Sequence, residues 1–138
     1  MNKASVLFLC TGNSCRSQMA EGFLRHFAGD RFGAVSAGTH PGTLSPEAVQ
    51  VMKELGIDIS GQRSKSLDEF LNRQISAVIT VCDHARQECP VFPGASVTLH
   101  WSIEDPANAR GTPEERLTTF RRIRDEIERR VKEFVASR

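Results

Sequence analysis

Residues 5–17 read SVLFLCTGNSCRS and join a continuous apolar run to the first turn of a helical pattern. The run at 5–9 is typical of a strand that is buried on both faces of a sheet. After a turn at 11–14, apolar residues recur at spacings of three and four as far as Phe27, and Gly29 with Asp30 ends the pattern. A buried strand, a tight turn and an amphipathic helix in this order predict an α/β fold with a parallel sheet.

The same alternation of strands and helices continues along the chain. Further strands are expected at 32–37, 75–81 and 95–100, and further helices at 45–55, 67–71 and from 112 to the end, with a loop at 101–110. Parallel strands joined by right-handed helical crossovers bind ligands beyond their carboxyl ends. Cys10 and Cys82 each stand at such an end. Their placement indicates that the two thiols act together.

The overall composition limits the classes of function. The chain has 138 residues, which fits one domain, and its net charge of +1 gives no basic excess for nucleic acid or an anionic membrane. The apolar stretch at 6–9 is too short for a signal peptide or a membrane span, so a cytoplasmic protein is expected. Thiols stay reduced there, and four cysteines therefore indicate catalysis, redox work or metal binding.

The segment from Cys10 to Ser17 contains a Cys-x5-Arg pattern that is suited to a tetrahedral anion. Its backbone N–H groups are expected to form the binding nest, contributed by Thr11, Gly12, Asn13, Ser14, Cys15 and Arg16. The Arg16 fork can grip two oxygens, and the Ser17 hydroxyl can donate to sulfur. These positive surroundings predict a lowered pKa and a nucleophilic thiolate at Cys10. The alternative is an unrelated cysteine and arginine, but their position between strand and helix favours the anion site.

Several motifs extend this interpretation along the chain. They are LFLCTGNSCRSQMAEG at 7–22, VSAG at 35–38, GIDIS at 56–60, Cys82, Cys89-Pro90, His100-Trp101, DPA at 105–107 and RDEI at 124–127. With them the chain resembles the arsenate reductases of the low-molecular-weight tyrosine phosphatase fold over nearly its whole length. The resemblance implies a single domain over 1–138, with a four-stranded parallel sheet flanked by helices. It also implies Cys10 as nucleophile, Arg16 as anion clamp and a role in arsenic resistance.

Asp105 resembles the family's general acid, which would protonate the oxygen that leaves. Asp-Pro is also a common turn pair, and spacing alone does not choose between Asp105 and Glu104. The phosphatase branch usually carries tyrosines after this pair to stack on an aromatic substrate, whereas this chain has no tyrosine. The absence favours a small oxyanion, arsenate above all, with phosphate or sulfate as related ligands.

Cys82 and Cys89 resemble the redox pair of the reductases. By this resemblance Cys10 attacks arsenate, Cys82 attacks Cys10 and releases arsenite, and Cys89 then forms a disulfide with Cys82 that thioredoxin reduces. No bound cofactor is implied. A disulfide needs Cα atoms within about 7 Å, so the segment 83–92 is expected to unwind partly on oxidation. Cys15 has no task in this scheme and is interpreted as structural.

A metal site is the competing interpretation of the cysteines. The spacings Cys-x4-Cys and Cys-x6-Cys do not form a pair of zinc knuckles, and no metal site is expected. The four histidines show no ligand spacing and are interpreted as surface or packing residues; they are His26, His40, His84 and His100.

Lys65 marks a departure from some relatives. There a potassium ion lies beside the loop, held by residues matching Asn13, Glu21 and Ser36 together with an aspartate. Lys65 stands at the position of the aspartate. The hypothesis is that its ammonium replaces the ion and makes the enzyme indifferent to potassium; the alternative is a solvated lysine.

Two other functions use the same residues. A low-molecular-weight phosphatase for small phosphate monoesters needs the same loop and acid, and the resemblance allows weak activity of this kind. A non-catalytic oxyanion sensor would leave the acid and the relay thiols unexplained. The sequence does not choose among thioredoxin, glutaredoxin and mycothiol as donor, although Cys89 favours thioredoxin. A monomer is expected.

Overall fold

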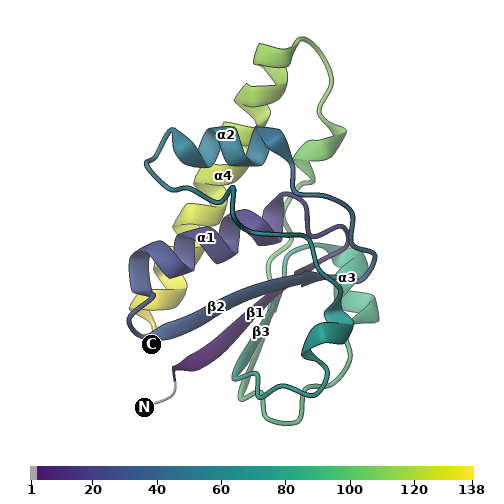
Figure 1. Ribbon diagram of the computed structural model, residues 1–138, viewed down its shortest axis with the longest axis vertical. Coiled ribbons are helices and arrows are strands. Elements are labelled where there is room, and N and C mark those ends of the chain that lie inside the picture. The colour runs from purple at the N-terminus through teal and green to yellow at the C-terminus, as the bar shows by residue number, and fades with distance from the viewer. Residues whose placement is uncertain (1–2) are drawn as a thin grey trace.

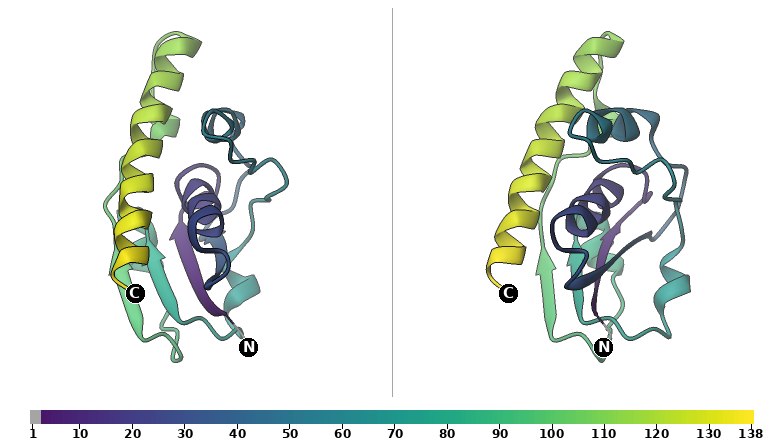
Figure 2. Two further views of the ribbon diagram at one scale, coloured as in Figure 1. Left: turned by 90° about the vertical axis from the view of Figure 1, so that its left-hand side faces the viewer. Right: turned by 60° about the vertical axis from the view of Figure 1, so that its left-hand side comes forward.

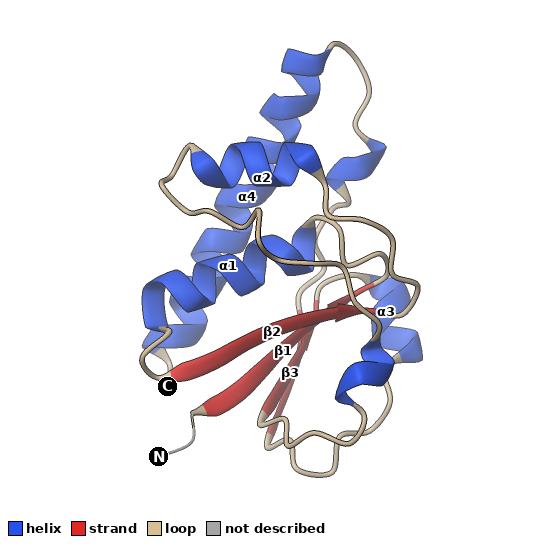
Figure 3. Cartoon of the chain, viewed as in Figure 1, coloured by secondary structure: helices blue, strands red, loops and turns tan. Residues whose placement is uncertain are grey.

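The computed structural model describes residues 3–138, so the first two residues of the expected domain lie outside the described part. Its centre is a four-stranded parallel sheet in the order β2-β1-β3-β4. The strands are β1 (Ala4–Cys10), β2 (Phe32–Gly38), β3 (Ala77–Thr80) and β4 (Val97–His100). The helices are α1 (Arg16–Ala28), α2 (Pro46–Lys53), α3 (Asp83–Glu88) and α4 (Pro113–Ala136), with 3-10 turns η1 (Leu67–Phe70) and η2 (Pro106–Asn108). This arrangement confirms the predicted fold class (Figures 1 and 3).

Helices cover the sheet on both faces. The β1-to-β2 and β3-to-β4 connections run in opposite directions across the sheet, so right-handed crossovers place α1 and α3 on opposite faces. The long helix α4 packs beside α1 and also touches α2 (Figure 2). The carboxyl ends of all four strands lie at the same end of the sheet. The candidate loop, residues 10–15, follows β1 at this end, and α3 follows β3.

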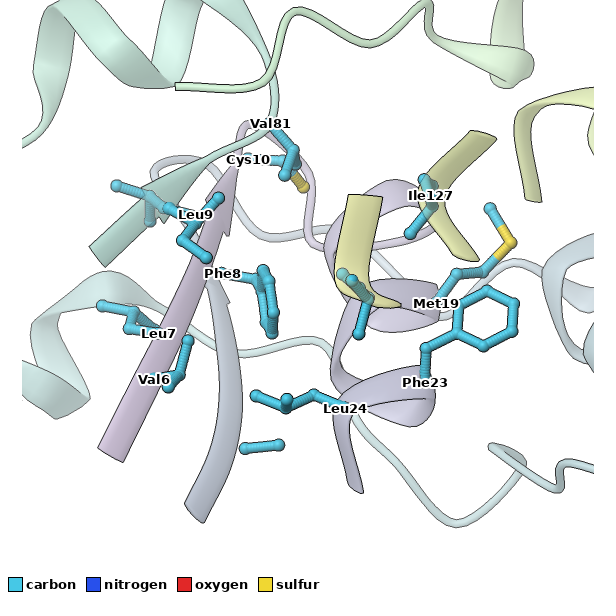
Figure 4. Close-up of a cluster of buried hydrophobic side chains, with 14 of the residues drawn as sticks. Val6, Leu7, Phe8, Leu9, Cys10, Met19, Phe23, Leu24, Val81 and Ile127 are labelled. Carbon is cyan, nitrogen blue, oxygen red and sulfur yellow. The ribbon is translucent and has the colours of Figure 1, made fainter. Parts of the chain in front are cut away.

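The central strand β1 is buried because β2 and β3 flank it and helices cover both faces of the sheet. Phe8 points toward α1 and α4, whereas Leu7 points to the opposite face (Figure 4). On the face covered by α1 and α4, Phe8 lies in a buried cluster with Met19, Phe23, Leu24 and Ile127. This double burial explains the unbroken apolar run at 5–9 and fixes the position of Cys10 at its end.

Side-chain caps mark the starts of α2 and α4. The Ser45 hydroxyl accepts the Ala48 N–H at 3.2 Å at the start of α2. Thr112 and Glu115 form a reciprocal capping box at the start of α4. Within residues 3–138 every helix is too short or too polar to cross a bilayer.

Four observed elements differ from the expected ones. The β3 ladder spans Ala77–Thr80 and not 75–81, although the Ser76 and Val81 N–H groups still donate to β1 carbonyls. β4 begins at Val97 and α2 ends at Lys53, two residues later and two earlier than expected. The fourth is α3, a six-residue helix that the apolar pattern did not predict. Six residues give too few turns for a helical period to be recognised.

The end of β2 lies against the candidate loop. A Cβ atom at Gly38 would lie 2.6 Å from the Thr11 carbonyl oxygen and 3.1 Å from the Asn13 nitrogen. A Cβ atom at Gly33 in the same strand would have its nearest neighbour at 3.6 Å, the Ser5 Oγ, which is an ordinary contact. Gly38 is therefore required by the close approach of two backbones.

We expect Gly38→Ala to push the loop out of position. Overpacking of this kind costs about 1–3 kcal/mol, so the free energy of unfolding in urea should fall by that amount. Phosphate binding, followed by calorimetry, should weaken with it. Gly33→Ala is the matched control and should change both quantities little. Equal behaviour of the two variants would contradict the role given to Gly38.

Candidate active site

The loop from Cys10 to Cys15 is held by hydrogen bonds to its carbonyl groups. Those of residues 10, 11, 12 and 14 accept N–H groups of Thr39, His40, Gly42 and Ser45, at 2.8–3.1 Å. The Gln18 amide donates to the Asn13 carbonyl at 3.0 Å. The carbonyls are thus satisfied from outside, and anion binding by the N–H groups of the loop stays a prediction. The Asn13 N–H already donates to the Cys10 Sγ.

Asn13 fixes the turn of this loop. Its φ of 49° lies in the left-handed region, which asparagine tolerates better than most residues. Its buried amide donates to the Ser17 Oγ at 2.8 Å and to the Ser36 Oγ at 3.0 Å, while its Oδ1 accepts the Lys65 N–H at 2.9 Å. The side chain thus joins the loop to α1, β2 and the segment before η1.

Cys10 lies at the base of the loop with 2% of its surface exposed. Its Sγ accepts the Asn13 N–H at 3.1 Å and lies 2.8 Å from the Ser17 Oγ. Burial raises the pKa of the thiol, while the Ser17 hydroxyl and the Arg16 charge act in the opposite direction. This direction is opposite to the expected lowering of the Cys10 pKa, because burial disfavours the thiolate more than its positive surroundings favour it.

Arg16 and Asp105 lie together at the rim of the loop. One Arg16 amino group donates to the Ile103 carbonyl at 2.9 Å, and the other lies 3.4 Å from an Asp105 carboxylate oxygen. Glu104 instead pairs with Arg122 on the surface of α4. The structure thus distinguishes two neighbours that spacing could not, and it is Asp105 that faces the loop.

The second cysteine lies beside the loop and the third lies apart from it. Cys82 is buried, its Sγ is 3.2 Å from the Thr11 Oγ1, and it caps α3 by accepting the Ala85 N–H. Cys89 follows the last residue of α3 and is half-buried, and burial raises the pKa of its thiol. The structure thus brings Cys82, but not Cys89, to the wall of the anion loop.

Cys15 is buried at the start of α1, with its Sγ 3.6 Å from the Ser14 Oγ. Burial is also the main cause of its raised pKa. These surroundings agree with the structural interpretation of its side chain, and its N–H group remains part of the expected nest.

A buried carboxylate supports the loop from below. Glu21 accepts the Ser36 hydroxyl at 2.6 Å and pairs with Arg25. The Lys65 ammonium lies 3.6 Å from the same carboxylate and 3.5 Å from the Ser36 Oγ. Burial lowers the pKa of Lys65, and the Glu21 charge opposes this effect. The structure therefore brings together Asn13, Glu21, Ser36 and Lys65, the four residues expected there.

Comparison with known proteins agrees with this geometry. The family model for low molecular weight phosphotyrosine protein phosphatase matches residues 5–137. An arsenate reductase of Halalkalibacterium halodurans is 49% identical over 97% of this chain and 96% of its own. The chain belongs to the arsenate reductase branch of this phosphatase family.

Solved structures of the branch have the same fold. An arsenate reductase in the phosphate binding state is 33% identical, with a TM-score of 0.80 over 97% of this chain and 98% of its own. The thioredoxin-dependent arsenate reductase of Corynebacterium glutamicum is 30% identical, with a TM-score of 0.77 over 98% of this chain and 61% of its own. Family membership thus rests on both sequence and structure.

Several contacts in the site could not be predicted from the sequence. No pattern in the sequence indicates that the Thr11 hydroxyl lies next to Cys82. The donors at 39–45 are backbone N–H groups, so their side chains do not reveal them either. The four histidines do lie at the surface or half-buried, as expected. Two of them, His40 and His84, come together in space although no spacing suggested it.

We expect the pH dependence of alkylation to report the raised pKa of Cys10. Iodoacetamide reacts with the thiolate, so the Cys10 rate should rise with pH through a midpoint above the value of about 8.5 for free cysteine. Ser17→Ala removes a group that lowers this pKa and should move the midpoint higher still. Ser96→Ala, an exposed serine before β4, is the control. Peptide mass spectrometry assigns the rate to Cys10, and a wild-type midpoint below that of free cysteine would contradict the prediction.

Proposed function

We propose that this protein reduces arsenate to arsenite with the three thiols of Cys10, Cys82 and Cys89. The observation that carries the proposal is the contact of the Cys82 Sγ with the Thr11 Oγ1. Phosphate ester hydrolysis needs only a nucleophile, an anion clamp and an acid. A second thiol in the wall of the anion loop is superfluous for hydrolysis, whereas reduction by two electrons requires it.

The first step is attack by Cys10 on bound arsenate. The loop N–H groups and the Arg16 guanidinium hold the oxygens, and the Cys10 thiolate forms an S–As bond. The thiol proton passes to an oxygen of the bound arsenate, and the Ser17 hydroxyl, 2.8 Å from the sulfur, stabilises the thiolate that remains. One arsenate oxygen departs as water and takes a proton from Asp105, whose carboxyl group lies at the loop rim beside Arg16. The same loop accommodates phosphate and sulfate as competitors.

The second step transfers two electrons. The Cys82 thiolate attacks the Cys10 Sγ, a disulfide forms between the two sulfurs, and the S–As bond breaks. The bonding pair stays on arsenic, which leaves as arsenite. Cys82 is prepared for this attack because β1 and β3 are neighbouring strands, and the Val81 N–H donates to the Leu9 carbonyl just before the two cysteines.

The third step requires α3 to open. Cys82 and Cys89 flank this helix, and seven residues of helical rise separate them by about 10 Å, beyond disulfide range. Ala85 is the only residue of α3 that is buried, so few apolar contacts resist unwinding. Cys89 then attacks Cys82 and frees Cys10. Thioredoxin, the donor of the Corynebacterium relative by its name, is proposed to reduce the Cys82–Cys89 disulfide in the cytoplasm.

Serine variants should stall at different steps of this relay. In single-turnover reactions we expect Cys10→Ser and Cys82→Ser to release no arsenite. Cys89→Ser should release one arsenite per chain and accumulate the Cys10–Cys82 disulfide, which non-reducing peptide mapping detects. With NADPH, thioredoxin reductase and thioredoxin, wild type alone should turn over continuously.

The same experiment tests the phosphatase alternative. If wild type releases no arsenite but hydrolyses p-nitrophenyl phosphate through Cys10 alone, the proposal of a reductase is wrong. Continuous turnover by Cys89→Ser with thioredoxin would instead show that the third thiol has no part in the relay.

We also propose that Lys65 is a built-in cation beneath the loop. Its ammonium lies near both Glu21 and Ser36, and its N–H group holds the Asn13 side chain. A positive charge at this point balances the buried Glu21 carboxylate and thereby keeps Ser36 and Asn13 in place.

Wild type should therefore have equal activity in potassium and in sodium at the same ionic strength. Lys65→Ala leaves room beside Glu21 and should lower the rate of arsenate reduction, with partial recovery in potassium but not in sodium. Lys53→Ala, which changes an exposed lysine at the end of α2, serves as the control. Marked activation of wild type by potassium would rule out the substitute cation.

A further inference from the structure

Three ligating side chains meet at the surface beside α3. The Nε2 atoms of His40 and His84 each lie 3.3 Å from one carboxylate oxygen of Glu88. The three atoms that could bind a metal all lie within 4.8 Å of one another, and all three residues are exposed. None of the steps assigned to the cysteines uses these side chains.

The backbone fixes the positions of all three ligands. His84 and Glu88 stand four residues apart on α3 and therefore share one face of the helix. His40 comes from the segment after β2, and its N–H group donates to the Thr11 carbonyl at 2.8 Å. One ligand is thus tied to the anion loop and two are carried by the helix between the relay cysteines.

The donor set suits zinc or a similar divalent transition ion. Imidazole nitrogens favour such ions, whereas magnesium and calcium prefer sites made of oxygen atoms. Two histidines and one glutamate also occur together at open zinc sites, where water takes the fourth position. In a tetrahedral site with zinc–ligand bonds of about 2.0–2.1 Å, neighbouring ligand atoms lie about 3.3 Å apart. Both His–Glu distances already have this value.

We propose that His40, His84 and Glu88 form a binding site for one Zn²⁺ ion or a similar transition-metal ion. The bound ion would join α3 to the segment that holds the anion loop. Since α3 has only one buried residue, three metal–ligand bonds would add substantially to what keeps it folded. The ion therefore acts as a clamp on α3.

Zinc binding is measured by calorimetry on the full chain with Cys10, Cys82 and Cys89 changed to serine, so that these thiols do not compete. We expect one equivalent to bind, and His40→Ala, His84→Ala and Glu88→Gln each to weaken binding about tenfold or more, as loss of a ligand should cost at least as much as loss of an outer hydrogen bond. His26→Ala, an exposed histidine on α1, should bind like the parent. No binding, or equal binding by all variants, would mean that the cluster is only an ion pair.

Hydrogen exchange tests the clamp separately. In the same triple-serine chain, Zn²⁺ should slow amide exchange in peptides covering 83–92, and His40→Ala should abolish the effect without any change in the sequence of α3. Unchanged exchange on zinc binding would overturn the clamp. Both readouts are independent of arsenate reduction, so they stand even if the proposed function fails.

One consequence rests on the proposed function. If α3 must open for Cys89 to reach Cys82, bound zinc should slow thioredoxin-coupled turnover. Zn²⁺ that binds the thiols should inhibit wild type and His40→Ala equally. If the clamp acts as well, wild type should be inhibited at a lower free Zn²⁺ concentration than His40→Ala. Equal inhibition of the two would remove this consequence.

Discussion

The site depends on one constraint, which is that the carbonyl groups of the anion loop must be satisfied from outside. A peptide segment can turn its N–H groups toward a ligand only if its carbonyls find partners on the other side, because an unpaired buried carbonyl is costly. Here the segment at 39–45 supplies most of those partners. β2 delivers that segment beside β1, so the parallel pairing of the two strands also holds the loop in place.

Electrostatics in the site is a balance between burial and charge. Cys10 and Glu21 are both buried, and both would be more stable neutral if nothing else acted on them. Glu21 has two cations near it, Arg25 and Lys65, and both are within ion-pair distance. The Cys10 thiolate is supported by the Arg16 charge, the Ser17 hydroxyl and the N–H groups of Ser17 and Asn13, but burial outweighs them.

The sequence allows prediction of what depends on local pattern and on recognisable motifs. The strand, turn and helix at 5–27 follow from periodicity, and Asp105 and Lys65 were both expected near the loop from the resemblance. Features that depend on tertiary structure could not be predicted from the sequence. The pKa of Cys10 needs the depth of its burial, which no motif contains, and α3 is too short to show a period. His40 and His84 lie close together because the segments after β2 and β3 leave the same end of the sheet. The spacing of the two histidines in the sequence does not show this.

The hydrogen bonds that hold the loop also determine where proline, which has no N–H group, is tolerated. Thr39, His40, Gly42 and Ser45 must each offer an N–H group, whereas Pro41 occupies a position from which no donation is needed. The four hydrogen bonds to the loop depend on the main-chain donors of this stretch and not on its side chains. A change to proline at any of the four donor positions would remove a support of the anion site while leaving every residue of the Cys-x5-Arg motif intact. Motif inspection alone would miss such a defect.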